Sequence, residues 1–160
     1  MSSSFDFDSA VAAAVANAVT LDDVQRAIIH FLREVCRATP GVGFHYVVGM
    51  ISSEGPEHIP RNLERLTAYT HAVRGHHGPY AFSARSIWTD GLFGRIGETK
   101  GMTTQDWMPF WRGVMESGCT AALHLCPRWE QSHGARDEVE TAQRLGIPIF
   151  LLDGAAAVVV

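Results

Sequence analysis

The chain lacks any run of basic residues and carries little charge of either sign. Its 160 residues include 13 Lys and Arg against 17 Asp and Glu, which gives a formal net charge of −4. Nucleic-acid polymers and anionic membranes are bound through clustered positive charge. We therefore expect neither of them as a partner, whereas small ligands, including single nucleotides, remain open.

Signals for export and for disulfide formation are also missing. The first ten residues are acidic without a basic region, and the Ala/Val-rich stretch 10–19 is too short to cross a bilayer. The three cysteines, Cys36, Cys119 and Cys126, have no C-x-x-C spacing and form an odd set within or beside apolar runs. They are typical of buried, reduced thiols, so we expect a cytoplasmic protein.

The sequence contains no internal repeat, low-complexity segment or linker. A chain of this length with 46% hydrophobic residues is long enough for one well-buried core and too short for two ordinary ones. We expect a single domain in which residues 1–40 form an N-terminal helical extension packed on an α/β domain of residues 41–160. Residues 1–8 are expected to fray.

Hydrophobic periodicity predicts alternating helices and strands. Strands are expected over 44–50, 121–126 and 147–152, with a further strand and its exit loop over 80–88. Helices are expected over 20–38, 60–74 and 135–145, with a further helix capped by Asp106 and ended by Gly118. Residues 89–102 are expected to form a long loop or a short helix with loops. This order predicts an α/β fold, Rossmann- or flavodoxin-like and doubly wound, with a mostly parallel sheet of four to five strands and helices on both faces.

The last strand, helix and strand form one βαβ unit over 121–152, and its helix carries an unusual carboxylate. Glu138 lies in the first turn of the predicted helix, on the same stripe as Ala135, Ala142 and Leu145, while Asp137 and Thr141 fall on the other side. Acidic residues near a helix start can simply complement the helix dipole. That explanation fits Glu138 poorly, because an inward carboxylate must be solvated or paired.

Two other stretches invite a functional interpretation. Gly49 and Ser52 lie in a small polar loop after the first strand, where a glycine lets a ligand approach the backbone, although an ordinary surface loop explains them as well. His76 and His77 are adjacent in a Gly/Pro turn without a third ligand at helical or hairpin spacing. We expect these histidines to lie in solvent, and we expect no metal and no other cofactor.

Several short motifs resemble the nucleoside 2-deoxyribosyltransferase-like superfamily, in particular its members that hydrolyse nucleoside monophosphates. The resemblance runs from about residue 44 to 152. It rests on a mid-chain Asp that opens a helix, Asp106, and on three motifs: Gly-x-Ile-Ser at 49–52, Ser-x-Gly-Ala-x-x-Glu-x-x-x-Ala at 132–142 and Gly-Ile-Pro-Ile at 146–149.

The resemblance implies a role for each matching residue. Glu138 would attack the anomeric carbon and form a glycosyl-enzyme ester. Ser132, with Gly134 beside it, would contact a 5′-phosphate, although a plain helix cap is an equal alternative for Ser132. Gly49 and Ser52 would face the ribose or phosphate. Asp106 would orient the base or sugar, and its capping position explains it equally well.

The loop before the predicted helix of Glu138, residues 127–134, and the start of that helix offer further candidate site residues. Trp129 can stack on a base or cap the hydrophobic edge. Arg128 or Arg136 can meet a phosphate at the helix N-terminus. Protonation of the leaving base is assigned to Asp106 or His133.

Two departures from the superfamily pattern bear on the reaction. Where deoxyribosyltransferases carry an Asp just past the strand before the glutamate helix, this chain has Cys126-Pro-Arg-Trp, and it lacks their aromatic C-terminal tail. These departures favour hydrolysis, or binding without turnover, over base exchange. The resemblance also implies a homodimer or larger homo-oligomer.

We predict an N-glycosidic bond hydrolase or transferase that acts on a nucleoside or nucleoside 5′-monophosphate through the Glu138 nucleophile. A carboxylate suits this reaction because it passes through an oxocarbenium-like state. The alternative is a non-catalytic nucleotide-binding or sensor domain of the same fold. A purely structural oligomerisation domain would leave Glu138 unexplained.

Overall fold

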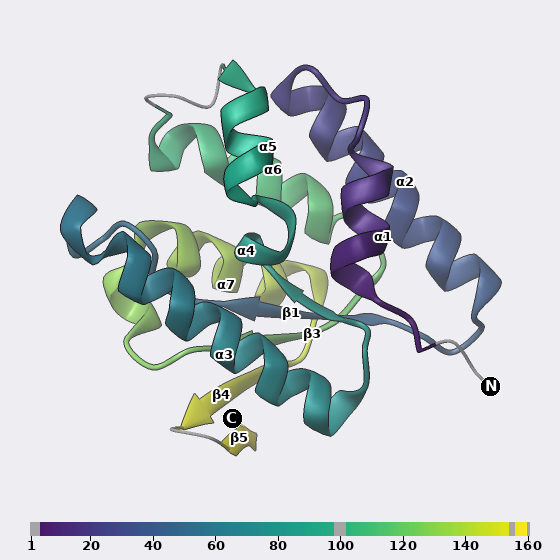
Figure 1. Ribbon diagram of the computed structural model, residues 1–160. Helices are drawn as coiled ribbons and strands as arrows, with labels where there is room; N and C mark the ends of the chain where they lie inside the picture. Colours follow the sequence, from purple (N-terminus) through teal and green to yellow (C-terminus); the bar gives the residue numbers. More distant parts are fainter. Residues whose placement is uncertain (1–3, 98–101, 154–155, 160) are drawn as a thin grey trace.

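The computed structural model describes residues 4–97, 102–153 and 156–159, and it contains a five-stranded sheet (Figure 1). The strand order is β2-β1-β3-β4-β5, with β1 (Phe44–Val48), β2 (Ala81–Ser83), β3 (Thr120–Leu125), β4 (Ile149–Asp153) and β5 (Ala156–Val159). The first four strands are parallel, and β5 pairs antiparallel with β4. The predicted fold class is confirmed, and the order 2-1-3-4 is that of flavodoxin-like sheets.

Helices cover both faces of this sheet (Figure 1). One face packs against α3 (Ile59–His77) in a small core, and the other carries the larger core. The helices that contribute to the larger core are α1 (Phe7–Ala14), α2 (Leu21–Ala38), α4 (Ala84–Ile87), α5 (Asp90–Arg95), α6 (Thr104–Met115) and α7 (His133–Leu145). Short 3-10 turns, η1 (Pro56–His58) and η3 (Trp129–Gln131), precede α3 and α7.

Alternation along the central strands decides which side chains meet which core. In β1, Phe44, Tyr46 and Val48 belong to the larger core, whereas Val47 belongs to the small core beside α3. The register pairs His45 with Ala122 and Val47 with His124, so β3 alternates in step with β1. Consecutive β1 residues therefore serve opposite faces of the sheet.

The N-terminal segment packs into the larger core within this single chain. Phe7 and Ile28 are buried there, and the Phe7 ring stacks on Phe82 with centroids 5.1 Å apart. Helix α1 begins at Phe7 because the Asp6 side chain accepts a hydrogen bond from the Ser9 backbone N–H. The expectation that residues 1–8 fray is therefore wrong for Phe7 and Asp8, which are helical.

Two predictions fail where a local hydrogen bond starts a helix. The segment 80–88 has its strand at Ala81–Ser83, but part of the predicted exit loop is the short helix α4, which starts where the Ser83 N–H donates to the Ser86 hydroxyl. Asp106 is not an N-cap. Thr103 caps α6, and Asp106 is the third helical residue of its capping box, so Pro109 lies inside the helix.

Helix α7 also begins earlier than predicted. Ser132 caps it and His133 is its first residue, which places Glu138 in the second turn instead of the first. Thr141 is buried and Leu145 is exposed, contrary to the predicted stripe, while Glu138 is buried as predicted. None of the helices within the described residues is long and apolar enough to cross a membrane.

Candidate functional site

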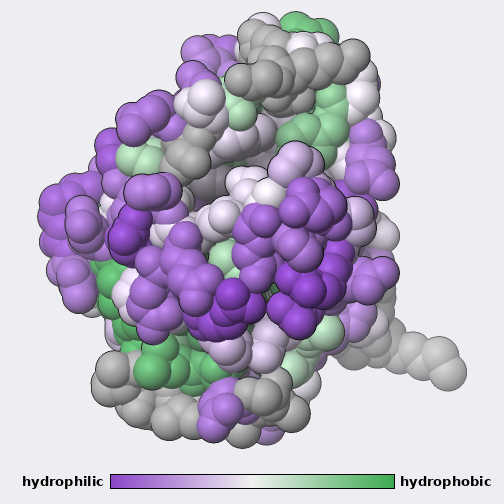
Figure 2. Space-filling view, turned by 90° about the vertical axis from the view of Figure 1, so that its left-hand side faces the viewer, coloured by the Kyte–Doolittle hydropathy of each residue, from purple (hydrophilic) through white to green (hydrophobic). Residues whose placement is uncertain are grey.

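A cavity of about 530 Å³ opens beside the carboxyl ends of the parallel strands. Figure 2 looks onto the side toward which the β1 arrow of Figure 1 points, and it shows a hollow bordered by hydrophilic side chains. Ligands of open α/β sheets bind at this edge, and the cavity has the size of a small-molecule site. The segments that line it are the end of β1, its exit loop, the starts of α3, α4, α6 and α7, and part of α5.

Glu138 lies in the wall of this cavity with only 7% of its surface exposed. The Tyr46 hydroxyl donates a hydrogen bond to its Oε1 over 2.6 Å. Burial raises the pKa of Glu138 to about 8, although the Tyr46 hydrogen bond acts in the opposite direction. The ordinary pKa of the group is 4.5. The cavity therefore holds a carboxyl group whose proton is exchanged close to neutral pH.

Tyr46 is held in place by rings on both sides. Its ring stacks on Phe82 at 5.0 Å and on Trp111 at 5.3 Å between centroids. Burial, together with the charge of Glu138, raises the pKa of Tyr46 well above its ordinary value of 10. The hydroxyl therefore keeps its proton and acts as a fixed hydrogen-bond donor to the carboxylate.

Aromatic side chains form much of the cavity wall. Trp88, Phe93, Trp107 and Trp111 all line it. Trp107 meets Trp88 edge-on with centroids 5.0 Å apart, and Phe93 lies 5.2 Å from Trp88. Such a wall presents ring faces and edges on which a planar, partly apolar ligand can pack.

Arg85 is the only positively charged residue among the described residues that line the cavity. Its guanidinium pairs with the exposed Asp90 carboxylate at 2.9 Å and keeps 28% of its side-chain surface exposed. An exposed ion pair of this kind is weak, because solvent screens it. An anionic ligand can therefore compete with Asp90 for this guanidinium.

The structure brings five of the predicted site residues to the cavity: Gly49, Ser52, Ser132, Gly134 and Glu138. Ser132 is also the helix cap, since its Oγ accepts the Ala135 N–H over 3.2 Å. The hydroxyl can still donate its own proton to a ligand.

Gly49 has a packing role that the sequence did not reveal. A Cβ at this position would lie 3.1 Å from Cys126 Sγ and 3.3 Å from a Leu66 methyl group. Close contact with neighbouring side chains thus accounts for glycine here. The loop that it begins still forms part of the cavity wall.

Three predicted site residues do not line the cavity. Asp106 is exposed, and its carboxylate accepts hydrogen bonds from the Thr103 backbone N–H and hydroxyl at 2.7 and 3.1 Å. Trp129 packs against the larger core. Arg128 pairs with Glu54 at 2.9 Å and lines a second cavity of about 330 Å³.

The two remaining candidate residues, His133 and Arg136, contact each other. His133 and Arg136 are exposed, and an Arg136 guanidinium nitrogen lies 2.6 Å from His133 Nδ1. Neither residue lines the cavity.

Sequence reasoning did not find Tyr46 or Arg85. Tyr46 could have been found from strand alternation, because it shares a face with Phe44 and Val48 and is the polar member of that face. Arg85 lies in the segment predicted as the second strand and its exit loop, and nothing in the pattern of that segment placed it at a cavity. The Ser83 cap turns the chain there and directs Arg85 to the site.

A separate histidine cluster lies on the other face of the sheet. His45, His77 and His124 each offer a ring nitrogen within 4.8 Å of the other two, a spacing that can hold a metal ion. His76 and His77 are exposed, as predicted. The two neighbours of His77 in this cluster come from two strands, so spacing along the sequence could not reveal the cluster.

Comparison with known proteins gives no relative from which a function could be transferred. No protein-family model, no curated protein and no solved structure matches this chain. Its function therefore has to be inferred from the residues of the cavity itself.

Proposed function

We propose that this chain cleaves the N-glycosidic bond of a nucleoside or nucleoside 5′-monophosphate, with Glu138 as the nucleophile. One observation carries the proposal: a buried carboxyl group, held by the Tyr46 hydroxyl, lies in the wall of a cavity at the ligand-binding edge of the sheet. A cavity of about 530 Å³ falls in the size range of small-molecule sites.

The chemistry suits a desolvated carboxylate. Glu138 attacks the anomeric carbon, the bond from that carbon to the base nitrogen breaks, and its electron pair leaves with the base, which takes a proton from water. Water then hydrolyses the glycosyl ester and restores Glu138. Positive charge develops at the anomeric carbon during cleavage. This positive charge and the ionised carboxylate of Glu138 attract each other most strongly where water is excluded.

The remaining walls fit the rest of a nucleotide. The rings of Phe93 and Trp107, which are less buried than Trp88, offer surface for the base. A 5′-phosphate would meet Arg85, or the Ser132 hydroxyl at the positive N-terminus of α7. Hydrolysis is favoured over base exchange, because no Asp follows β3 in the transferase position.

The test is whether the protein releases free base from a panel of nucleosides and 5′-monophosphates, and chromatography measures the released base. Glu138→Gln should abolish release, because the amide cannot form the ester. Glu140→Gln is the matched control, since Glu140 is exposed on the same helix. Base release that survives Glu138→Gln undiminished would contradict the assignment of the nucleophile.

The pH dependence of kcat/KM separates a nucleophile from a general acid. The pKa of Glu138 is about 8, so about one molecule in ten carries the ionised form at pH 7. If Glu138 acts as nucleophile, kcat/KM rises with pH and levels off above about pH 8. A rate that falls across this range would assign Glu138 as an acid instead.

The same pKa favours one second candidate, a nucleotide-binding or sensor domain without turnover. A carboxyl group that is mostly protonated at pH 7 can donate a hydrogen bond to an acceptor on a base. In that case nucleotides raise the melting temperature and release no base. Glu138→Gln then lowers the affinity modestly, because the amide can also donate.

Location and assembly follow as lesser parts of the proposal. All three cysteines are free, which suits a reducing compartment such as the cytoplasm. A homodimer or larger homo-oligomer remains a prediction from the superfamily resemblance. Light scattering at several protein concentrations tests it.

A further inference from the structure

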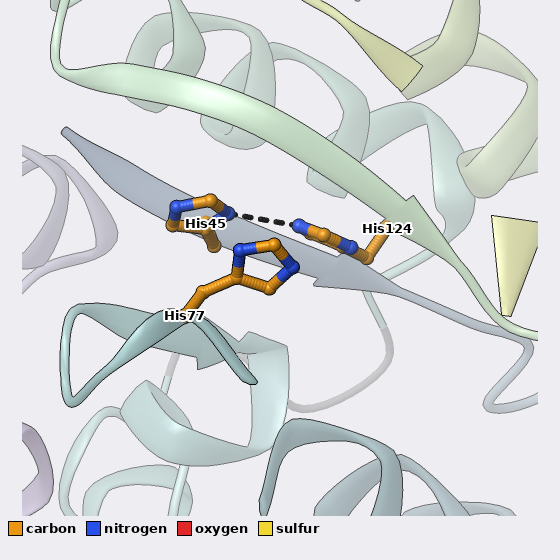
Figure 3. A group of neighbouring side chains, drawn as sticks. All are labelled: His45, His77 and His124. Atoms are coloured by element: carbon orange, nitrogen blue, oxygen red, sulfur yellow. Dashed lines mark hydrogen bonds between the residues drawn. The ribbon is translucent and has the colours of Figure 1, made fainter. Parts of the chain in front are cut away.

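Three histidines from three different elements meet beside the sheet, on the face covered by α3 (Figure 3). His45 comes from β1, His124 from β3, and His77 is the last residue of α3. His45 Nδ1 lies 2.9 Å from His124 Nε2. The His77 ring centroid lies 4.5 Å from that of His45 and 5.0 Å from that of His124.

The fold fixes two of these rings and places the third at their side. Because β1 and β3 are parallel neighbours and His124 pairs with Val47, His45 and His124 are diagonal neighbours on one face of the sheet. Helix α3 ends over this point, and the Gly78 N–H bonds to the Arg74 carbonyl in closing it. His77 is exposed, so its ring can move toward the other two.

His124 is an unusual residue for a buried position on this face of the sheet. It is fully buried, its Nε2 faces His45 Nδ1, and its Nδ1 has no hydrogen-bond partner within the described chain. A buried polar atom without a partner costs stability. Packing alone would favour an apolar side chain here, since Phe150 stacks on the His124 ring at 5.2 Å.

We propose that His45, His77 and His124 bind one zinc ion. Zinc binds imidazole nitrogen at ~2.0–2.1 Å, so two ligands of a tetrahedral site lie about 3.3 Å apart. The pair at 2.9 Å is already near that separation. His77 offers a ring nitrogen within 4.8 Å of the other two, and its ring has to turn out of its stack on His45 to complete the group. Three imidazole ligands suit zinc, whereas magnesium and calcium require oxygen ligands.

The protonation state of the cluster is compatible with this site. Burial lowers the pKa of His124 to about 4 and lowers the pKa of His45, with the neighbouring histidines adding to both shifts. Both shifts favour the neutral ring, which is the form that binds metal. The bound ion would tie the end of α3 to β1 and β3 and leave a fourth position for water.

The test is zinc binding by untagged, metal-free protein, measured by competition with a chromophoric chelator, and cobalt absorption as a check of geometry. We expect one equivalent of zinc, a zinc-dependent rise in melting temperature, and a tetrahedral cobalt spectrum. His77→Ala should weaken zinc binding by more than about tenfold, because loss of a direct ligand exceeds the effect of an outer residue. His77 is exposed, so this variant should fold.

His76→Ala is the matched control, since His76 is the neighbouring exposed histidine on the same helix end and is not part of the cluster. It should bind zinc as the unaltered protein does. Equal binding by the two variants, or no stoichiometric binding by the unaltered protein, would overturn the proposal. The outcome is independent of the proposed glycosidase activity, because neither readout involves the cavity of Glu138.

Discussion

Both faces of the sheet bury a polar side chain, but the surroundings of the two side chains differ. On the cavity face, Glu138 is buried beside a hydrogen-bond donor, Tyr46, and open space. On the α3 face, His124 is fully buried with one ring nitrogen unpaired within the described residues. The partners are consecutive residues of β1. His45 contacts His124 on the α3 face, and Tyr46 donates a hydrogen bond to Glu138 on the cavity face. One strand thus holds two chemically unlike sites apart by alternation alone.

The largest expected effect tests whether the two faces act independently. Glu138→Gln should lower base release by at least about a thousandfold, as loss of a nucleophile does, and leave zinc binding unchanged. His77→Ala should weaken zinc binding and leave base release unchanged. Chromatography of released base and chelator competition on both variants measure this. A variant that loses both functions would show that the faces are coupled, or that the fold is damaged.

A smaller effect concerns the pH dependence of stability on the cavity face. The pKa of Glu138 is about 8 in the folded chain against an ordinary 4.5, so the folded state binds the extra proton between these values. The free energy of unfolding should therefore fall as pH rises from about 4.5 to about 8 and level off above.

Glu138→Gln removes this dependence, and above pH 8 the variant should be more stable by on the order of 2–4 kcal/mol, since one pKa unit corresponds to ~1.4 kcal/mol. Urea denaturation at pH 4.5 and pH 8.5 measures the difference. Glu140→Gln, at an exposed position, should show no such change between the two pH values. Equal pH dependence in both variants would contradict the raised pKa.

The role of Arg85 sharpens the picture of the cavity mouth. Arg85→Ala should raise KM for a 5′-monophosphate about tenfold, because a charge-assisted hydrogen bond is lost, and should leave KM for the nucleoside unchanged. Steady-state kinetics on the matched substrate pair measure this. Arg136→Ala is the control, since Arg136 is exposed and does not line the cavity. An equal rise in KM for both substrates would show that Arg85 does not bind the phosphate.

The smallest expected effect concerns Asp106. Asp106→Ala removes one side of the α6 capping box, so it should lower stability by ~0.5–1 kcal/mol and leave base release nearly unchanged. Thermal unfolding and the base-release assay measure the two effects. A large loss of release at unchanged stability would return Asp106 to the catalytic group that the superfamily resemblance implied.

Much of the fold and part of the site could be predicted from local pattern. Apolar runs marked the central strands, and helical periodicity placed Glu138 on a buried stripe even though the start of α7 was misplaced. The prediction failed at two helix starts: a helix follows Ser83 where an exit loop was predicted, and Thr103 instead of Asp106 caps α6. A short polar cap decides a helix start within one or two residues, and periodicity over a longer window does not resolve it.

By itself the sequence determined the α/β class, the mostly parallel sheet and the inward position of Glu138, because these depend on periodicity within segments and on the order of the segments along the chain. Only the tertiary structure decided that Tyr46 donates to Glu138, that Arg85 lies at the cavity, and that His77 meets His45 and His124. These partners are far apart in the chain, and strand register and helix placement bring them together. The choice of neighbour across a sheet is a property of the packed molecule.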